Sequence, residues 1–484
     1  MEEKNLKFDA DITFETEKLE SIHCEVVFPK TQDEKVLILA RFNTIDSPVP
    51  KIPFIFALNA TISDLKGNPL IYISASKVYK LEISTSYYDT NRSVSILRAE
   101  PVDLKICKRI LQADSQKKSF HFWLTQSILL APAYYPELHH NGNITINTFD
   151  TKRFEVLNGL QFNFVNYYIH YDDPKRKNVR SSRSILAAEF TGVTGQDLGE
   201  ATLPNIEKFL KLVSFAERRR IVCYGYRGIS DGEITDFYRG DIFVPEEDFD
   251  HLLSETLIDK RDFQEFVSQV SPIAENCVFR EHLFDAIGKI AYRESSTLES
   301  EYLSYYSALE NLVNGYRDAS SFHYILENDS WKKFSKDLKD FIKTHDFFKA
   351  EKDQESNEVR SRNENRQLMY EKILELNRVS FGTVFKSFCN DYGVDLRDLW
   401  SLGGGEVSTS LSKIRNRLIH GGRFEREEYE AVIYARSHLK WTLERCILRV
   451  LGWNVERSRV CSTFLEPCVG YSEWREKLNL LKNG

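Results

Sequence analysis

Apolar residues in the first two hundred positions recur in short runs, which either alternate with polar residues or are rich in β-branched side chains. Turn-forming Asn, Asp, Gly and Pro separate these runs, as in SDLKGNP at 63–69. Many short strands between such turns are typical of a sandwich or a partly closed barrel. We predict strands within residues 35–42, 53–62, 68–83, 93–106, 119–131 and 153–171.

The stretch 201–270 mixes two periodicities. The apolar residues of 204–217 fall on one helical face, whereas 220–228 and 233–243 have the composition of strands. From residue 246 acidic residues precede an apolar run, as they do at a helix N-terminus. We therefore expect a mixed α/β connector here.

Beyond the connector the apolar spacing is mostly helical, with stretches at 260–292, 298–317, 330–349, 367–393, 408–420 and 424–451. Residues 349–367 are highly charged and predict an exposed loop or a solvated helix extension. These patterns predict a multidomain α+β protein, in which a β-rich N-terminal half precedes an all-α helical bundle. Its expected parts are a β-rich domain over 1–200, the connector over 201–270, a helical domain over 271–455 with a charged insertion near 318–367, and a tail over 456–484.

Composition narrows the class of protein. A length of 484 residues predicts two or three domains, and an apolar content of 42% indicates a folded chain. The net charge of −7 means that any contact with nucleic acid must be local. We expect neither a membrane span nor a secretory signal, because the start is charged and no apolar run approaches about 18 residues. The eight scattered cysteines have no CxxC spacing, so we expect free thiols in the cytoplasm and no metal site.

The stretch KIRNRLIHGG at 413–422 carries the candidate chemistry. At about 100° per residue, Arg415 falls with the apolar side of its helix, and His420 lies about 140° away from it. Asn416 lies between the two in projection, and Gly421 and Gly422 stand where a helix C-cap needs a positive φ. Between Val407 and Phe424 there is no acidic residue, and the basic ones are Lys413, Arg415, Arg417 and Arg423. This stretch predicts a local attractor for phosphate in an acidic chain.

An upstream helix, LESEYLSYYSALENLVNGYR at 298–317, places Glu310 at the edge of an apolar face. A carboxylate at such an edge must be solvated, paired or turned toward a cation. We expect Arg415 as its partner. The 413–422 motif, the local basic charge and the position of Glu310 each have an ordinary structural explanation when taken alone. Their combination indicates a functional site more specifically.

The segment LSKIRNRLIH resembles the R-N-x3-H motif of HEPN (higher eukaryotes and prokaryotes nucleotide-binding) domains, which are helical bundles. Many of them are metal-independent ribonucleases. SYYSALENLVNGY is similar to the early HEPN helix that carries an acidic residue after an aromatic-rich face. This resemblance covers roughly 275–452, and the longer, charged stretch 318–400 departs from a minimal bundle. A β-rich half before a C-terminal HEPN domain is similar in layout to bacterial anti-phage defence proteins of the ApeA type.

The resemblance implies roles for individual residues. His420 would deprotonate the ribose 2′-OH or protonate the leaving 5′-oxygen, and Arg415 would stabilise charge on the scissile phosphate. Asn416 would orient the backbone or a partner helix, and Glu310 would hold Arg415 or His420. Three cations would bind flanking phosphates of the RNA: Lys413, Arg417 and Arg423.

The implied protein is a cytoplasmic, metal-independent endoribonuclease that needs no cofactor, because the nucleophile belongs to the RNA. It would act as a homodimer through the HEPN domain and cleave cellular RNA such as tRNA in abortive infection. The β-rich half would then sense a phage-derived trigger. The alternative is a non-catalytic HEPN module that binds a nucleotide or a protein, and a third interpretation is a plain helical scaffold.

Overall fold

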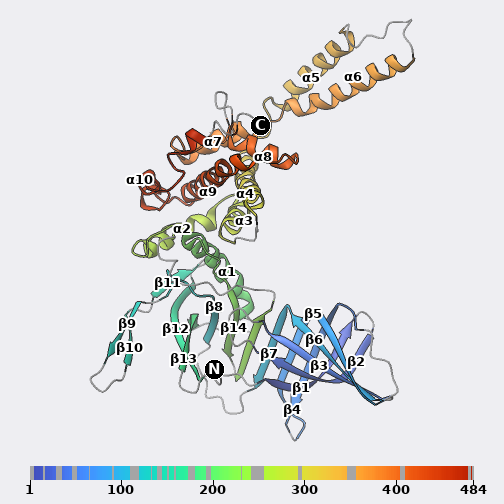
Figure 1. Ribbon diagram of the computed structural model, residues 1–484, viewed down its shortest axis with the longest axis vertical. Helices are drawn as coiled ribbons and strands as arrows, with labels where there is room; N and C mark the ends of the chain where they lie inside the picture. The colour runs from blue at the N-terminus through green and yellow to red at the C-terminus, as the bar shows by residue number, and fades with distance from the viewer. Residues whose placement is uncertain are drawn as a thin grey trace. The chain divides into compact units, whose positions relative to one another are not determined.

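The chain forms two compact units, of which one comprises Met1–Glu275 with Arg457–Arg459 and the other Asn276–Glu456 with Val460–Gly484. The first is rich in strands and the second is helical, which confirms the α+β class (Figure 1). The computed structural model describes residues 5–14, 17–28, 35–45, 52–64, 66–89, 92–109, 119–131, 133–138, 144–149, 152–156, 160–172, 180–191, 198–230, 232–240, 256–292, 297–345, 356–403, 409–477 and 481.

The N-terminal unit contains a 13-stranded antiparallel sheet and, apart from it, a two-stranded one. The large sheet consists of β1 (Leu6–Phe14), β2 (Glu17–Val27), β3 (Leu37–Ile45), β4 (Ile55–Ser63), β5 (Pro69–Asp89), β6 (Arg92–Pro101), β7 (Asp103–Arg109), β8 (Ser119–Leu124), β11 (Lys152–Val156), β12 (Leu160–Asp172), β13 (Arg180–Thr191), β14 (Cys223–Ser230) and β15 (Glu233–Arg239). The small sheet pairs β9 (Ala133–Leu138) with β10 (Ile144–Phe149).

Strand β5 joins a closed ring of strands to an open sheet. Around the ring the order is β5, β4, β1, β2, β3 and β6, and β6 pairs with β5 again. Over Ile71–Ser74 the same strand β5 pairs with β7, from which the open sheet continues through β15, β14, β8, β13 and β12 to β11. The closed arrangement is therefore found instead of a sandwich. A strand of 21 residues is long enough to serve both parts.

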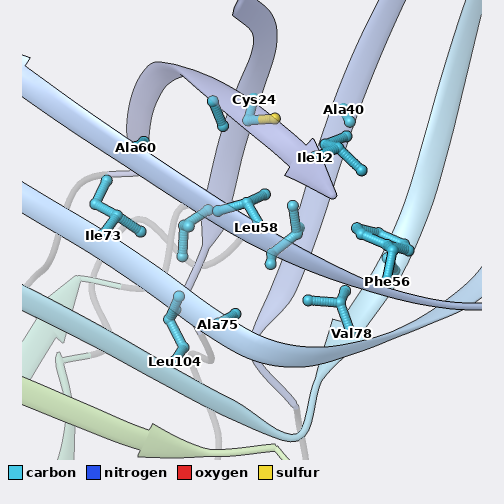
Figure 2. Packing of buried hydrophobic residues seen from close by; sticks show 14 of the residues in the cluster. Ile12, Cys24, Ala40, Phe56, Leu58, Ala60, Ile73, Ala75, Val78 and Leu104 are labelled. Atoms are coloured by element: carbon cyan, nitrogen blue, oxygen red, sulfur yellow. The ribbon is translucent and has the colours of Figure 1, made fainter. Parts of the chain in front are cut away.

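The inside of the ring is filled by every second residue of its strands. On β1 the buried residues are Phe8, Ala10 and Ile12, which alternate with exposed or half-buried positions. Successive side chains of a strand point to opposite faces, so one apolar set lies inside (Figure 2). Each such Ile, Val or Phe side chain contributes about 1.5–3 kcal/mol on full burial. The ring residues belong to one hydrophobic cluster, to which Leu104 and Ile106 of β7 and Tyr238 of β15 also contribute.

The sequence pattern does not predict strands β1, β2, β9, β10 and β13. In β2 the buried residues are Cys24 and Val26, near its end, so most of the strand carries no apolar period. The expected connector also contributes to the sheet, because β14 and β15 lie between β8 and β7. The helix that we expected from residue 246 begins outside the described residues.

Helix α1 (Leu198–Glu217) covers part of the open sheet through the face that its spacing predicts. Ile206, Phe209, Leu210 and Val213 are buried. The ring of Phe209 contacts those of two phenylalanines on β11 and β12, Phe154 and Phe164. Helix α2 (Phe263–Asn276) follows on the chain.

Helices α4 and α9 form the centre of the C-terminal unit. Helix α4 contacts α3, α7, α8 and α9, and α9 is buried over most of its circumference. The expected stretch 260–292 is divided between α2 and α3, and the charged insertion contains the hairpin of α5 and α6. The helices of this unit are α3 (Arg280–Ala291), α4 (Leu298–Ala319), α5 (Asn328–Thr344), α6 (Ser356–Leu376), α7 (Phe381–Tyr392), α8 (Leu411–Ile419), α9 (Tyr429–Val450), α10 (Ser462–Leu465) and α11 (Trp474–Lys477), with the short 3-10 helices η4 (Arg426–Glu428) and η5 (Val455–Arg457).

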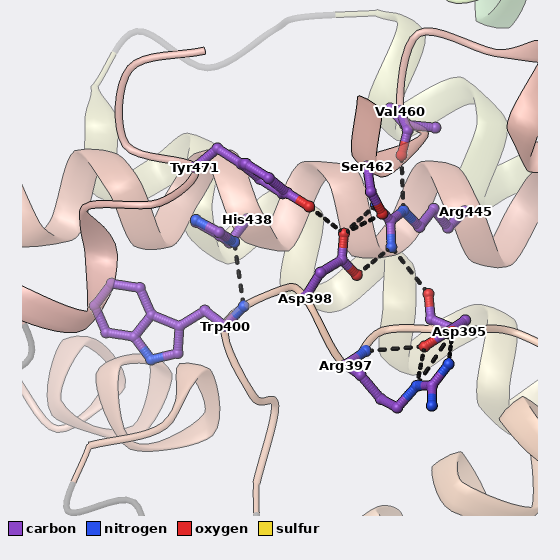
Figure 3. A network of polar contacts seen from close by, with 9 residues as sticks. All are labelled: Asp395, Arg397, Asp398, Trp400, His438, Arg445, Val460, Ser462 and Tyr471. Carbon is purple, nitrogen blue, oxygen red and sulfur yellow. Dashed lines mark hydrogen bonds and ion pairs between the residues drawn. The ribbon is translucent and has the colours of Figure 1, made fainter. Parts of the chain in front are cut away.

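Polar contacts fasten the C-terminal tail to α9. Both terminal nitrogens of Arg445 donate to Asp398, at 2.6 and 2.7 Å, and its Nε donates to the carbonyl of Val460 at 2.8 Å. The hydroxyls of Ser462 and Tyr471 also donate to Asp398 (Figure 3). Burial raises the pKa of Asp398, but the hydrogen bonds from Arg445, Tyr471 and Ser462 outweigh it and hold that pKa well below its usual range. The tail thus has an ionic anchor in place of a periodic apolar face.

A buried histidine lies beside this anchor. Nδ1 of His438 accepts the backbone N–H of Trp400 at 3.1 Å, so its Nε2 donates to the carbonyl of Gly470 at 3.0 Å. Burial lowers the pKa of His438 to about 4, which keeps the ring neutral at neutral pH.

Across the described part of the chain, no helix has both the length and the apolar character that crossing a bilayer requires.

Candidate functional site

Helix α8 is positioned by its N-terminus and its apolar side. The side chain of Ser410 caps it by accepting the backbone N–H of Lys413. Leu411 and Ile414 are buried, as their spacing predicts. On α4, the hydroxyl of Tyr302 donates to the carbonyl of Leu411 at 2.7 Å. The first turn of α8 is therefore held against α4.

The guanidinium of Arg415 lies between two side chains of α4. Its Nη2 approaches the carboxylate of Glu310, at 3.3 Å from Oε1, and its Cζ lies 5.5 Å from the ring centre of Tyr306. The two charged side chains are 29% and 31% exposed, so the ion pair forms in a partly dehydrated place. The expected pairing of Glu310 with Arg415 is present. In the described contacts, Glu310 bonds to Arg415 and not to His420.

The ring of Tyr306 is itself held in place through its hydroxyl. Its hydroxyl lies 2.8 Å from Oγ of Ser412, whose hydroxyl donates to the carbonyl of Leu402 at 2.6 Å. Burial raises the pKa of the Tyr306 hydroxyl, so it stays protonated at neutral pH. The face that supports Arg415 is thus an immobilised neutral ring, which attracts a cation.

His420 is the last residue of the helical hydrogen-bonding pattern. Its backbone N–H donates to the carbonyl of Asn416 at 3.0 Å. Gly421 follows with φ +75° and donates to Leu418, and Gly422 donates to Arg417. These two bonds form a Schellman motif, which a glycine in the left-handed region makes easily. The expected positive φ is therefore found at Gly421 but not at Gly422, because one left-handed residue is enough to end the helix. The imidazole is exposed at the end of the helix.

Asn416 connects the two halves of the predicted motif. Its Oδ1 accepts a hydrogen bond from Nη1 of Arg415 at 3.1 Å, while its carbonyl accepts the N–H of His420. The side chain is exposed, as is that of His420. A shift of either Arg415 or the helix end would therefore disturb the other through this residue.

The three cations expected to bind phosphate occupy different environments. Lys413 and Arg423 are exposed. Arg417 instead forms a two-point ion pair with Glu428, at 2.7 and 2.8 Å, and its guanidinium stacks 4.3 Å from the ring centre of Phe424. Because a buried carboxylate neutralises Arg417, we assign it a structural role in place of the expected phosphate-binding one.

The sequence pattern does not identify Glu428, Tyr306 and Ser412 as residues that support the site. Glu428 belongs to the run EREEYE, in which nothing local distinguishes a buried acid from solvated ones. The spacing of residues 298–317 places Tyr306 on an apolar face but does not indicate its contact with Arg415. Burial raises the pKa of Glu428, but the hydrogen bonds from Arg417 and the N–H of Glu425 outweigh it and lower that pKa. This acid therefore remains ionised at neutral pH.

The site consists of the fixed guanidinium of Arg415, the exposed imidazole of His420 five residues later, and the exposed cations Lys413 and Arg423. Such a set can bind a phosphodiester and transfer protons beside it. Among the residues that the structure describes, no three His, Cys, Asp or Glu side chains gather as they would around a metal ion. Comparison with protein-family models, curated proteins and solved structures finds no match for the chain.

Proposed function

We propose that this chain is a metal-independent endoribonuclease of the HEPN type. The observation that carries the proposal is the pairing of Arg415 with Glu310 and Tyr306, five residues before an exposed His420. The pairing holds a permanently charged fork near the helix end, where the imidazole is open to solvent. Phosphodiester cleavage through a 2′-OH uses proton transfer and stabilisation of the charge on the phosphoryl oxygens, which an imidazole and a guanidinium can supply.

In the proposed reaction, the imidazole of His420 takes the proton of the ribose 2′-OH, or delivers one to the leaving 5′-oxygen. The 2′-oxygen attacks the phosphorus, a 2′,3′-cyclic phosphate forms, and the P–O5′ bond breaks. Arg415 stabilises the charge that develops on the phosphoryl oxygens. Asn416 and Glu310 keep Arg415 in place, and Lys413 and Arg423 bind flanking phosphates. The 2′-OH requirement selects RNA over DNA.

The proposed active form is a homodimer. One helix carries one Arg415 and one His420 on different sides, whereas a two-fold axis would place two copies of each around one phosphodiester. The substrate would be a cellular RNA such as tRNA. In an abortive response to phage, the N-terminal unit would serve as the sensor of a phage-derived trigger.

Digestion of RNA tests the proposal directly. Purified full-length protein is incubated with total RNA, with and without extract from phage-infected cells, and the new RNA ends are sequenced. We expect cleavage by the wild type and none by His420→Ala of equal thermal stability. Equal cleavage by the two proteins would contradict the mechanism.

One observation is equally compatible with the alternative, a non-catalytic module that binds a nucleotide or a protein. The carboxylate of Glu310 compensates part of the charge of Arg415, which suits holding a ligand as well as stabilising a transition state. The same assay separates the two functions. A binding module would retain RNA or nucleotide on the protein but produce no new ends in either sample.

A further inference from the structure

Four contacts tie the guanidinium of Arg417 to the turn that follows His420. Nη1 and Nη2 donate to the two carboxylate oxygens of Glu428, Nη2 also donates to the carbonyl of Arg423 at 2.5 Å, and the plane stacks on Phe424. Glu428 is 5% exposed and Phe424 is 8% exposed. The turn is therefore fastened to a buried carboxylate and a buried ring.

The backbone of the turn packs against the same side chain. The N–H of Gly422 donates to the carbonyl of Arg417 at 2.8 Å. A Cβ on Gly422 would lie 2.6 Å from Cγ of Arg417 and 2.9 Å from its carbonyl oxygen, closer than real Cβ atoms approach. Glycine at 422 thus permits the close contact that places Arg417 beneath the turn.

The carboxylate of Glu428 bonds to both ends of the segment that follows Arg417. Its Oε2 accepts the backbone N–H of Glu425 at 2.7 Å, as well as the guanidinium. One carboxylate therefore joins the end of α8 to the beginning of η4 and α9. His420 lies inside this closed segment, between Arg417 and Glu428 in the chain.

We infer that Arg417 and Glu428 are positioning residues for His420, which act by fixing the turn and not by touching RNA. This inference rests on the ribonuclease function proposed above. A planar fork that bonds a carboxylate and a carbonyl together defines one geometry of the turn. Misplacement of a catalytic group by about 1 Å can cost on the order of 100-fold in rate.

Glu428→Gln is the decisive variant, because it removes no cation. If Arg417 served to bind phosphate, losing its carboxylate partner would strengthen RNA binding and lower KM. The positioning role requires the opposite, a fall in kcat of about 10- to 100-fold with KM within about twofold. Arg417→Met and Arg417→Lys should show the same fall, since an ammonium cannot form the two-point pair.

The experiment uses full-length protein, unfractionated tRNA as the probe and Arg426→Met as the control. Arg426 is exposed at the start of η4, so Arg426→Met removes the same charge as Arg417→Met but leaves the ion pair of Arg417 with Glu428 in place. Hydrogen–deuterium exchange of peptides that cover 411–428 provides a readout without RNA. We expect faster exchange of the amides of Gly421 and Gly422 in Glu428→Gln and wild-type exchange in Arg426→Met.

Each result decides one question. A lower KM in Glu428→Gln, or a raised KM with unchanged kcat in Arg417→Met, would overturn the positioning role. If wild-type protein cuts no RNA under any condition, the proposed ribonuclease function fails. Unchanged exchange in Glu428→Gln would separately refute the fixing of the turn by Arg417 and Glu428. If Glu428→Gln or Arg417→Met loses its thermal transition, Gly422→Ala is tested in place of that variant. A Cβ at position 422 would displace the side chain of Arg417 from the side opposite Glu428.

Discussion

The carboxylate of Glu310 on α4 lies 3.3 Å from Nη2 of Arg415 on α8, across 105 residues of sequence. The two side chains are less than a third exposed. A pair in this setting contributes little to the free energy of unfolding, but it determines where the guanidinium points.

Replacing Glu310 should therefore affect activity more than stability. In Glu310→Gln we expect the free energy of unfolding to change by less than about 1 kcal/mol. RNA cleavage should fall about tenfold or more, because Arg415 loses its ionic partner and no longer has one orientation. Thermal unfolding and single-turnover cleavage measure the two effects. A large loss of stability with unchanged cleavage would contradict this role.

Metal chelation should leave RNA cleavage unaffected. The proposed nucleophile is the ribose hydroxyl, and the proposed electrophilic group is Arg415, so no step needs a cation as Lewis acid. Cleavage is measured after dialysis against EDTA and again after a divalent ion is restored. Loss of activity in EDTA with recovery on adding the ion would indicate another class of nuclease.

The Asp398 anchor should be important for stability. Asp398→Asn would leave the guanidinium of Arg445, 4% exposed, without its counter-charge and should cost about 3–5 kcal/mol. Asp395→Asn is a matched control, since Asp395 pairs with an Arg397 that is 90% exposed, and it should cost less than about 1 kcal/mol. Urea unfolding at pH 7.5 measures both. Similar costs for the two variants would argue against the anchor.

Acid should destabilise the C-terminal unit through His438. Its pKa is about 4 in the folded chain against an ordinary value of 6.5, so the unfolded chain binds more protons between these pH values. Stability then falls as the pH drops from about 6.5 toward about 4, by roughly 3 kcal/mol in total if that pKa difference is complete. The depressed pKa of Asp398 adds a loss of the same sign at lower pH.

Urea unfolding at several pH values should follow this slope in the wild type. In His438→Gln the component between pH 6.5 and 4 should disappear, whereas His323→Gln, at a half-exposed surface histidine, should retain it. A slope that is equal in all three proteins would show that the loss has another origin.

Two glycines should respond to alanine with opposite signs. Gly421 has φ +75° at the end of α8, so Gly421→Ala should cost about 1 kcal/mol through backbone strain although its Cβ has open space. Gly288 lies inside α3, where a Cβ meets nothing within 4 Å, so Gly288→Ala should stabilise by about 0.5–1 kcal/mol. Thermal unfolding distinguishes them, and stabilisation by Gly421→Ala would refute the Schellman turn.

Local periodicity in the sequence was sufficient to predict the buried faces of the helices that carry the candidate site. The spacing of 298–317 and 408–420 shows which face of each helix is buried, and it therefore predicted the ion pair of Glu310 with Arg415. The C-cap was predicted at Gly421 and Gly422 from their position alone, and Gly421 has the positive φ. These features depend on residues within a few helical turns, which is the range that a sequence pattern reports.

Other features depended on which elements meet in space. The strands of 223–239 lie between β7 and β8, and β5 closes a ring with β6, but alternation states only that a strand has a buried face. From the sequence, Arg417 is indistinguishable from the other cations of 413–423. In the structure, Glu428 pairs with it. A charge pattern cannot show which cation finds a buried carboxylate, because that depends on packing between α8 and the start of α9.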